Sequence, residues 1–158
     1  MDALTESVRE AYARFFVDPE AVWKHLSPAV VFHVAGDHPL SGDHVGLEAV
    51  RRYVATVTSA TNGRAGFSVT SAFTDESGTL LLVEGTAFHG DEPFVRTIVH
   101  LIRLEDGLVV EFWDNPFDQR AEDQYWSARV PPQRTTPAAG RGTGVGVPSQ
   151  LMRAVGHS

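Results

Sequence analysis

Asp114 and His100 are the side chains in this sequence whose type and position best suit acid/base chemistry. Asp114 ends an alternating apolar and polar run at residues 108–114, which is typical of a β-strand. Asn115-Pro116 must end that strand, because proline donates no backbone hydrogen bond and restricts the residue before it. The sequence therefore predicts a carboxylate at the edge of a sheet.

A short hairpin is expected to bring the imidazole to this carboxylate. His100 lies in the preceding strand-like run, residues 97–104, and Glu105-Asp106-Gly107 connects the two runs. Glycine in this connection can adopt the positive φ that tight hairpins need. We therefore expect His100 and Asp114 to be neighbours.

Proton transfer is the chemistry that such a pair suits. Apolar surroundings disfavour a charged carboxyl group, so burial is expected to raise the pKa of Asp114 towards neutrality. Asp114 can then act as a general base or a general acid. His100, or His33 in the apolar run 29–34, would hold Asp114, polarise a substrate carbonyl or exchange a second proton.

The turns along the sheet predict which side chains share a face. Side chains alternate along a strand, and directly opposed residues share a face. The turn at 90–93 places Phe88 opposite Phe94, and the turn at 105–107 places Leu104 opposite Val110 or Leu108. One apolar face then carries four ionisable side chains, which are Glu84, Arg96, His100 and Asp114.

Structural roles compete with this interpretation. Glu84 and Arg96 can form an ion pair that only holds the sheet together, and His100 can be a core histidine with satisfied hydrogen bonds. Histidines and aspartates at 33–44 follow no recognised ligand spacing, so we expect no metal. The second face of the sheet is also apolar, which favours a homodimer formed through the sheet.

The periodicities along the chain predict an α+β domain. Helical spacing covers residues 2–16, 19–26 and 46–59, and strand-like runs cover 29–34, 65–73, 79–88, 94–104 and 108–114. A loop at 36–46 and a short helix at 118–126 complete the domain. We expect a conical barrel at residues 1–130, in which a curved antiparallel sheet wraps on three N-terminal helices. Residues 131–158, rich in proline and glycine, are expected to form a flexible tail.

Composition narrows the classes of partner. The chain has 158 residues, a net charge of −7 and no cysteine. This charge, without a basic stripe, disfavours nucleic acid, and no stretch is apolar enough for a signal peptide or a membrane span. The absence of cysteine fits a cytoplasmic protein. We expect the partner to be a small hydrophobic molecule or a second copy of the chain.

Two motifs resemble a known family. FHVAGDHPLSG at 32–42, followed by Gly46 at the start of a helix, is similar to a loop of the SnoaL-like domains. Glu111-Phe112-Trp113-Asp114, with Asp118 after it, is similar to their last strand. These domains belong to the nuclear transport factor 2 superfamily, and the likeness covers about residues 4 to 127. It implies a conical α+β barrel, commonly dimeric, with an apolar cavity.

The resemblance also implies a reaction. The polyketide cyclases of this family close a ring by intramolecular aldol chemistry, with an acid/base aspartate and without cofactor or metal. That aspartate matches Asp114, and the pocket histidines match His33 and His100. The fold is also similar to ketosteroid isomerase and to limonene epoxide hydrolase. The hydrolase uses an aspartate–arginine–aspartate arrangement, for which Arg96 and Asp114 are present with Glu84 as the only stand-in for the second aspartate.

We therefore expect a cofactor-independent aldol cyclase or isomerase that acts on a small, apolar, polyketide-like carbonyl compound. Asp114 would remove a proton next to the carbonyl, and His100 and His33 would stabilise the enolate. The alternatives are an epoxide hydrolase and a non-catalytic dimeric module that binds a hydrophobic ligand. The candidates for substrate binding are Trp23, Tyr53, Phe67, Glu84, Arg96, Phe112 and Asp37.

Overall fold

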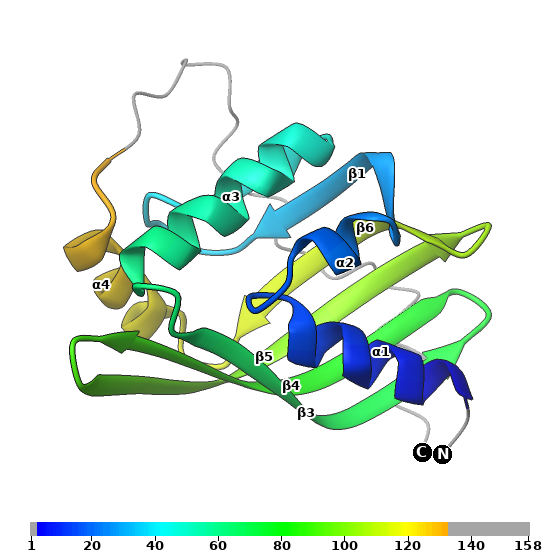
Figure 1. Ribbon diagram of the computed structural model, residues 1–158. Helices are drawn as coiled ribbons and strands as arrows, with labels where there is room; N and C mark the ends of the chain where they lie inside the picture. Colours follow the sequence, from blue (N-terminus) through cyan, green and yellow to red (C-terminus); the bar gives the residue numbers. More distant parts are fainter. Residues whose placement is uncertain (1–2, 133–158) are drawn as a thin grey trace.

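Six strands form one curved sheet in the computed structural model, which describes residues 3–132 (Figure 1). In chain order the elements are α1 (Ala3–Arg14), α2 (Glu20–Trp23), β1 (Leu26–Val34), β2 (Gly42–Val45), α3 (Leu47–Ala60), β3 (Ala65–Asp75), β4 (Gly78–His89), β5 (Glu92–Glu105), β6 (Leu108–Pro116) and α4 (Gln119–Arg129). The tail expected at 131–158 lies outside the described residues from residue 133 onward.

The strand order is β2-β1-β6-β5-β4-β3. Strands β3 to β6 form the expected antiparallel meander, and β1 adds to β6 in parallel. Helices α1, α2 and α3 lie on one face of the sheet, with α1 over β3 and α3 over β1 and β2 (Figure 1). The predicted α+β fold class is thus confirmed. We call the face under these helices the inner face and the opposite face the outer face.

The inner face packs against the apolar stripes of the helices. Residues three and four apart share one side of a helix, and α3 buries Val50, Val54 and Val57 in this way. Tyr12 and Phe16 do the same on and just after α1. They join one core with inner-face residues of the sheet, among them Leu81, Val83, Ala87, Ile98, Ile102 and Phe112.

The hairpin between β5 and β6 sets the predicted pairing of His100 with Asp114. Its connection is Asp106-Gly107, and both residues have positive φ, 50° and 78°, as a tight primed turn requires. An irregularity follows, because Leu104 pairs with Val109 whereas Arg103 pairs with Glu111. One residue of β6, Val110, is therefore extra at this point. Beyond it the strands have the register that the predicted pairing of Leu104 with Val110 would give.

The predicted register of β4 on β5 is wrong by one residue. Ala87, not Phe88, pairs with Phe94, because His89 and Glu92 are already paired and only Gly90-Asp91 forms the loop. A slip of one residue turns every side chain of a strand to the other face. Glu84 consequently lies exposed on the outer face, and Leu81, Val83 and Ala87 lie on the inner face instead.

Strands β1 and β2 also differ from the expectation. Strand β1 begins at Leu26, although the sequence predicts a helix to residue 26 and a strand only from residue 29. Its pairing with β6 is interrupted between Leu26 and Val31, so Pro28 removes no ladder hydrogen bond there. The expected loop contains strand β2 at the sheet edge, where its residues pair with β1. Polar and glycine residues are tolerated on such a short edge strand.

Helix α4 lies beside the end of the sheet near the β4–β5 hairpin (Figure 1). The Asp118 carboxylate accepts a hydrogen bond from the Ala121 amide at 3.0 Å and so caps the helix N-terminus. The Asp123 carboxylate accepts hydrogen bonds from the Asp37 amide and from Gln119 Nε2, at 3.0 and 2.9 Å. These contacts fix the start of α4 to the loop after β1. Within residues 3–132, no helix has the length and apolar character needed to cross a membrane.

Alanine at Gly36 should destabilise the domain more than alanine at Gly63. Both glycines have positive φ, 98° and 74°, so each substitution incurs about 1–2 kcal/mol of backbone strain. A Cβ at Gly36 would also overlap the side chains of Gln119 and Asp123, whereas at Gly63 it meets nothing within 4 Å. We expect Gly36→Ala to lower the free energy of unfolding, measured in urea, by about 1–2 kcal/mol more than Gly63→Ala. Equal losses would contradict this role of Gly36.

Candidate functional site

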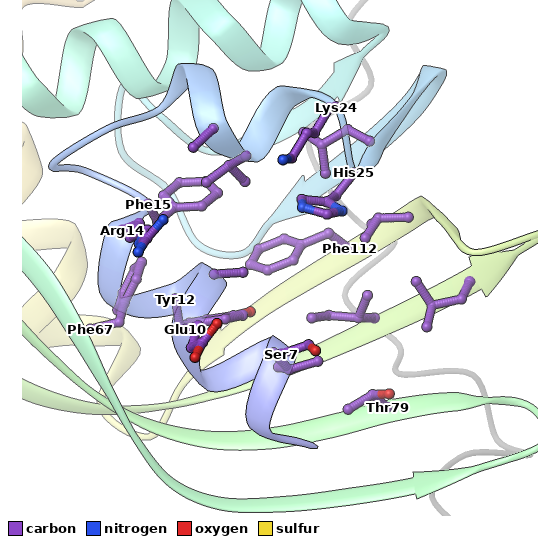
Figure 2. Close-up of a pocket in the computed structure, with 18 of the residues that line it drawn as sticks. Ser7, Glu10, Tyr12, Arg14, Phe15, Lys24, His25, Phe67, Thr79 and Phe112 are labelled. Atoms are coloured by element: carbon purple, nitrogen blue, oxygen red, sulfur yellow. The ribbon is translucent and has the colours of Figure 1, made fainter. Parts of the chain in front are cut away.

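A cavity of about 430 Å³ lies between α1 and the inner face of the sheet (Figure 2). Its wall is mostly apolar and aromatic, with the rings of Tyr12, Phe15, Phe16, Phe32, Tyr53, Phe67 and Phe112. The exposed part of the lining is polar and includes Glu10, Arg14, Lys24 and His25. Such a volume and lining suit a small, largely apolar ligand with few polar groups.

Asp114 is the carboxylate of the sheet that lines this cavity, and it forms a hydrogen-bonded chain with two other groups. His100 Nε2 lies 3.1 Å from Asp114 Oδ2, and His100 Nδ1 lies 3.1 Å from the Tyr12 hydroxyl. The side chain of His100 is fully buried, whereas that of Asp114 is 14% exposed. Asp114 Oδ1 has no hydrogen-bond partner among the described residues. That oxygen is therefore free to meet a ligand.

The direction of each hydrogen bond follows from the phenol. Burial raises the pKa of Tyr12 well above its ordinary value, and the nearby Asp114 charge raises it further. Tyr12 therefore keeps its hydroxyl proton. Because the Asp114 carboxylate oxygen only accepts, the arrangement that satisfies all three groups has the Tyr12 hydroxyl donating a hydrogen bond to His100 Nδ1. A neutral imidazole that accepts at Nδ1 carries its proton on Nε2, so His100 donates to Asp114 Oδ2.

Aromatic rings hold the imidazole in place. The centroids of Phe112 and Phe67 lie 4.7 and 5.0 Å from that of His100, and the Phe67 ring meets it edge-on. Figure 2 shows Phe112 projecting into the cavity beside α1, which carries Tyr12. The imidazole is thus fixed by packing as well as by hydrogen bonds, as a group that must orient a carboxylate should be.

A buried ion pair joins α4 to the inner face of the sheet. Arg96 of β5 forms an ion pair with Glu122 of α4, and their side chains are 13% and 6% exposed. Trp126 Nε1 donates to Glu122 Oε2 at 2.6 Å. Burial raises the pKa of Glu122 to about 7, against the opposing effect of Arg96 and with a further increase from Asp114. The pair attaches α4 to the sheet.

The structure brings together part of the predicted site. His100 and Asp114 are in contact as expected, and Tyr53, Phe67 and Phe112 line the cavity. His33 does not join them, because Phe32 points inward and the next side chain must point outward. On the outer face His33 lies 2.7 Å from Asp43 Oδ1 and 2.8 Å from Glu111 Oε2, and it stacks on Trp113.

Four other candidates lie away from the cavity lining. Trp23 is buried in the core against Phe15, and its Nε1 donates to Glu20. Asp37 is exposed in the loop after β1. Glu84 is exposed on the outer face, and the expected Glu84–Arg96 pair is not formed because the β4–β5 register places the two side chains on opposite faces.

Tyr12 and Glu122 were missed by the sequence interpretation. The helical spacing of Tyr12 places it on the buried side of α1, but spacing does not show that its hydroxyl meets an imidazole 88 residues away in the chain. Glu122 lies in an acidic segment that fits a helix N-terminus, so its partner on β5 was hidden. Among the described residues no group of histidines and carboxylates is arranged to hold a metal ion.

The comparisons with known proteins agree with the α+β fold of this chain. Residues 6–112 match the model of the SnoaL-like domain, and the chain belongs to that family. No curated protein sequence matches the chain.

Solved structures with the same fold share little sequence with this chain. Bal32a, from a soil-derived mobile gene cassette, is 21% identical with a TM-score of 0.72, covering 77% of this chain and 95% of its own. TerC is 15% identical with a TM-score of 0.66, covering 77% and 96%. A putative SnoaL-like polyketide cyclase from Jannaschia sp. CCS1 is 18% identical with a TM-score of 0.59, covering 75% and 90%. Other similar structures are described as cystatin-like and NTF2-like proteins.

Glu122 should make the free energy of unfolding fall as the pH rises. Its pKa is raised from 4.5 to about 7 on folding, so its contribution is complete below pH 4.5 and is lost as the pH rises through about 7. Between about pH 5.5 and about pH 8, wild type should lose about 1–2 kcal/mol more than Glu122→Gln in urea denaturation. Glu48→Gln, at an exposed ion pair, is the control and should behave as wild type. The account of Glu122 is wrong if Glu122→Gln retains the wild-type pH dependence.

Proposed function

We propose that the protein is a cofactor-independent acid/base enzyme, of the aldol cyclase or isomerase type, acting on a small apolar carbonyl compound. The observation that carries this proposal is the cavity-facing Asp114 carboxylate, held by a fully buried His100 that is itself held by Tyr12. A carboxylate with one oriented oxygen and one free oxygen, in apolar surroundings, suits removal of a proton from carbon.

The proposed reaction begins when Asp114 Oδ1 takes a proton from the carbon next to a substrate carbonyl. The C–H electron pair forms a C=C bond, and the carbonyl π pair moves to oxygen as an enolate. His100 keeps its hydrogen bond to Asp114 Oδ2 and so fixes the direction of the carboxyl group. Asp114 then returns the proton to a different carbon of a conjugated enolate, which gives an isomer. Alternatively, the enolate carbon attacks a second carbonyl in the same molecule, which closes a ring, and the alkoxide oxygen formed there takes the proton from Asp114.

Family and neighbours support this class of reaction. The chain belongs to the SnoaL-like family, and putative polyketide cyclases are among the similar structures. TerC was co-crystallised with polyporic acid. The aromatic walls around Phe112 and Phe67 are compatible with a planar, unsaturated substrate, since flat rings can pack against them.

Two other functions remain as proposals. The chain can serve as a non-catalytic module that binds a hydrophobic ligand, because Tyr12 and Asp114 also satisfy both ring nitrogens of the buried His100, which is a structural role. An epoxide hydrolase needs a second acid beside Arg96. Glu122 supplies an acid there in place of Glu84, although it comes from α4.

A homodimer through the sheet is our proposal for assembly. The outer face carries apolar residues, among them Val95 and Phe73, which are each 56% exposed. Exposed apolar residues on a sheet face are typical of an interface. The cytoplasmic location expected from the sequence stays a prediction.

Replacing Asp114 by asparagine should abolish proton removal while leaving the fold intact. We expect hydrogen exchange next to the carbonyl of 2-tetralone, followed by NMR in D₂O, to fall by about a hundredfold or more, because the amide is not a base. Asp43→Asn, on the outer face beside His33, is the matched control and should exchange at the wild-type rate. Unchanged exchange in Asp114→Asn would remove Asp114 from the mechanism. Absence of exchange in the wild type with any enolisable aryl ketone would favour the binding module.

A charge on the outer face should dissociate the dimer. We expect wild type to elute with the mass of a dimer in light scattering coupled to gel filtration, and Val95→Lys to elute as a monomer, because burying an unpaired ammonium group is costly. Val17→Lys is the control, since Val17 is 83% exposed after α1 and away from the sheet. A wild-type monomer, or a Val95→Lys dimer of unchanged stability, would contradict this assembly.

A further inference from the structure

The enolate oxygen of the proposed reaction needs a hydrogen-bond donor, and His100 is not available for it. Both ring nitrogens of His100 are engaged, one by Asp114 and the other by Tyr12. His33, the second histidine expected to stabilise the enolate, lies on the outer face between Asp43 and Glu111. The donor must therefore come from another side chain on the cavity wall.

Tyr53 is a cavity-lining side chain that offers such a donor. It projects from α3, between the buried Val50 and Val54, and lines the same cavity as Asp114. Its hydroxyl has no hydrogen-bond partner among the described residues, whereas the Tyr12 hydroxyl in the same cavity bonds His100. A tyrosine without a hydrogen-bond partner on the wall of a cavity is available to donate to a ligand atom there.

The ring of Tyr53 is held in a fixed position. Its centroid lies 6.2 Å from that of Phe32, edge-on, and 4.9 Å from that of His44. His44 is itself fixed, because its Nε2 donates to the Leu40 carbonyl at 2.8 Å. A donor on a ring packed in this way does not need to be ordered when the substrate binds.

The electrostatic surroundings keep the Tyr53 proton in place. Burial raises the pKa of Tyr53 far above its ordinary value, and the next largest effect is the charge of Asp114. Arg96 lowers the pKa of Tyr53 and Glu122 raises it, each by less than Asp114 raises it. A neutral phenol of this kind can donate to a developing oxyanion without itself ionising.

We propose that the Tyr53 hydroxyl donates a hydrogen bond to the substrate's carbonyl oxygen and holds the enolate oxygen while Asp114 holds the transferred proton. This inference rests on the proposed function and specifies its substrate as an enolisable ketone. The ketone oxygen lies at Tyr53 and the acidic carbon at Asp114. Tyr53, which the sequence interpretation names only as a candidate for substrate binding, thereby becomes a catalytic residue.

Binding of 2-naphthol, whose ionised form mimics an enolate, tests this role without turnover. The measurement uses Asp114→Asn, because asparagine stands in for the protonated acid that is present beside the enolate. We expect Asp114→Asn to bind 2-naphthol and to lower the pKa of the bound naphthol, followed by its absorbance as the pH is varied. Adding Tyr53→Phe should weaken binding about tenfold and raise that pKa by about one unit, since one hydrogen bond to the anion is lost.

Tyr125→Phe is the matched control, because the Tyr125 hydroxyl also lacks a hydrogen-bond partner but lies against Phe94, away from the cavity lining. It should leave naphthol binding unchanged. In the wild-type background, Tyr53→Phe should also slow 2-tetralone exchange by about a hundredfold. Circular dichroism of each variant should match that of the wild type.

The two levels of the proposal fail in different ways. Unchanged exchange in Asp114→Asn overturns the proposed function. If Asp114→Asn stops exchange while Tyr53→Phe leaves both exchange and naphthol binding unchanged, only the role of Tyr53 is overturned. Failure of Asp114→Asn to bind 2-naphthol also overturns the role of Tyr53.

Discussion

The register of β5 on β6 is the constraint on which the candidate site depends. The Asp106-Gly107 turn and the irregularity after it place His100 opposite Asp114 on the inner face. A shift of one residue would turn one of these side chains to the outer face. The inner face would then lack either the carboxylate or the group that orients it. The turn therefore decides which chemistry the cavity can perform.

The inner face carries more ionisable groups than an apolar core usually tolerates, and each has a partner of a different kind. Asp114 has His100, and Arg96 has Glu122. Buried charges are costly unless paired, and these contacts offset part of the desolvation penalty. Only Asp114 keeps an oxygen towards the cavity. Asp114 is therefore available for chemistry, whereas Glu122 attaches α4 to the sheet.

The sequence predicts the class of fold and the central pair because both depend on local signals. Alternation, an Asp-Gly turn and a proline at the strand end are enough to place His100 beside Asp114. The sequence alone does not predict contacts between elements that are distant in the chain. Glu84 was assigned to the wrong face because the β4–β5 turn is shorter than its composition suggests. His33 was assigned to the wrong face because no hairpin joins β1 to β6, so alternation could not be followed from one strand to the other. Tyr12 and Glu122 meet the sheet through helix packing, which periodicity does not position.

The central claim is that Tyr12, His100 and Asp114 form one hydrogen-bonded chain whose proton positions leave Asp114 as an oriented base. Nitrogen-15 NMR of the His100 ring in the ligand-free protein near neutral pH tests this claim most directly, because the chemical shifts report which nitrogen carries a proton. The account predicts a neutral ring with the proton on Nε2 and an unprotonated Nδ1 that accepts from Tyr12. A proton on Nδ1, with or without one on Nε2, would contradict it.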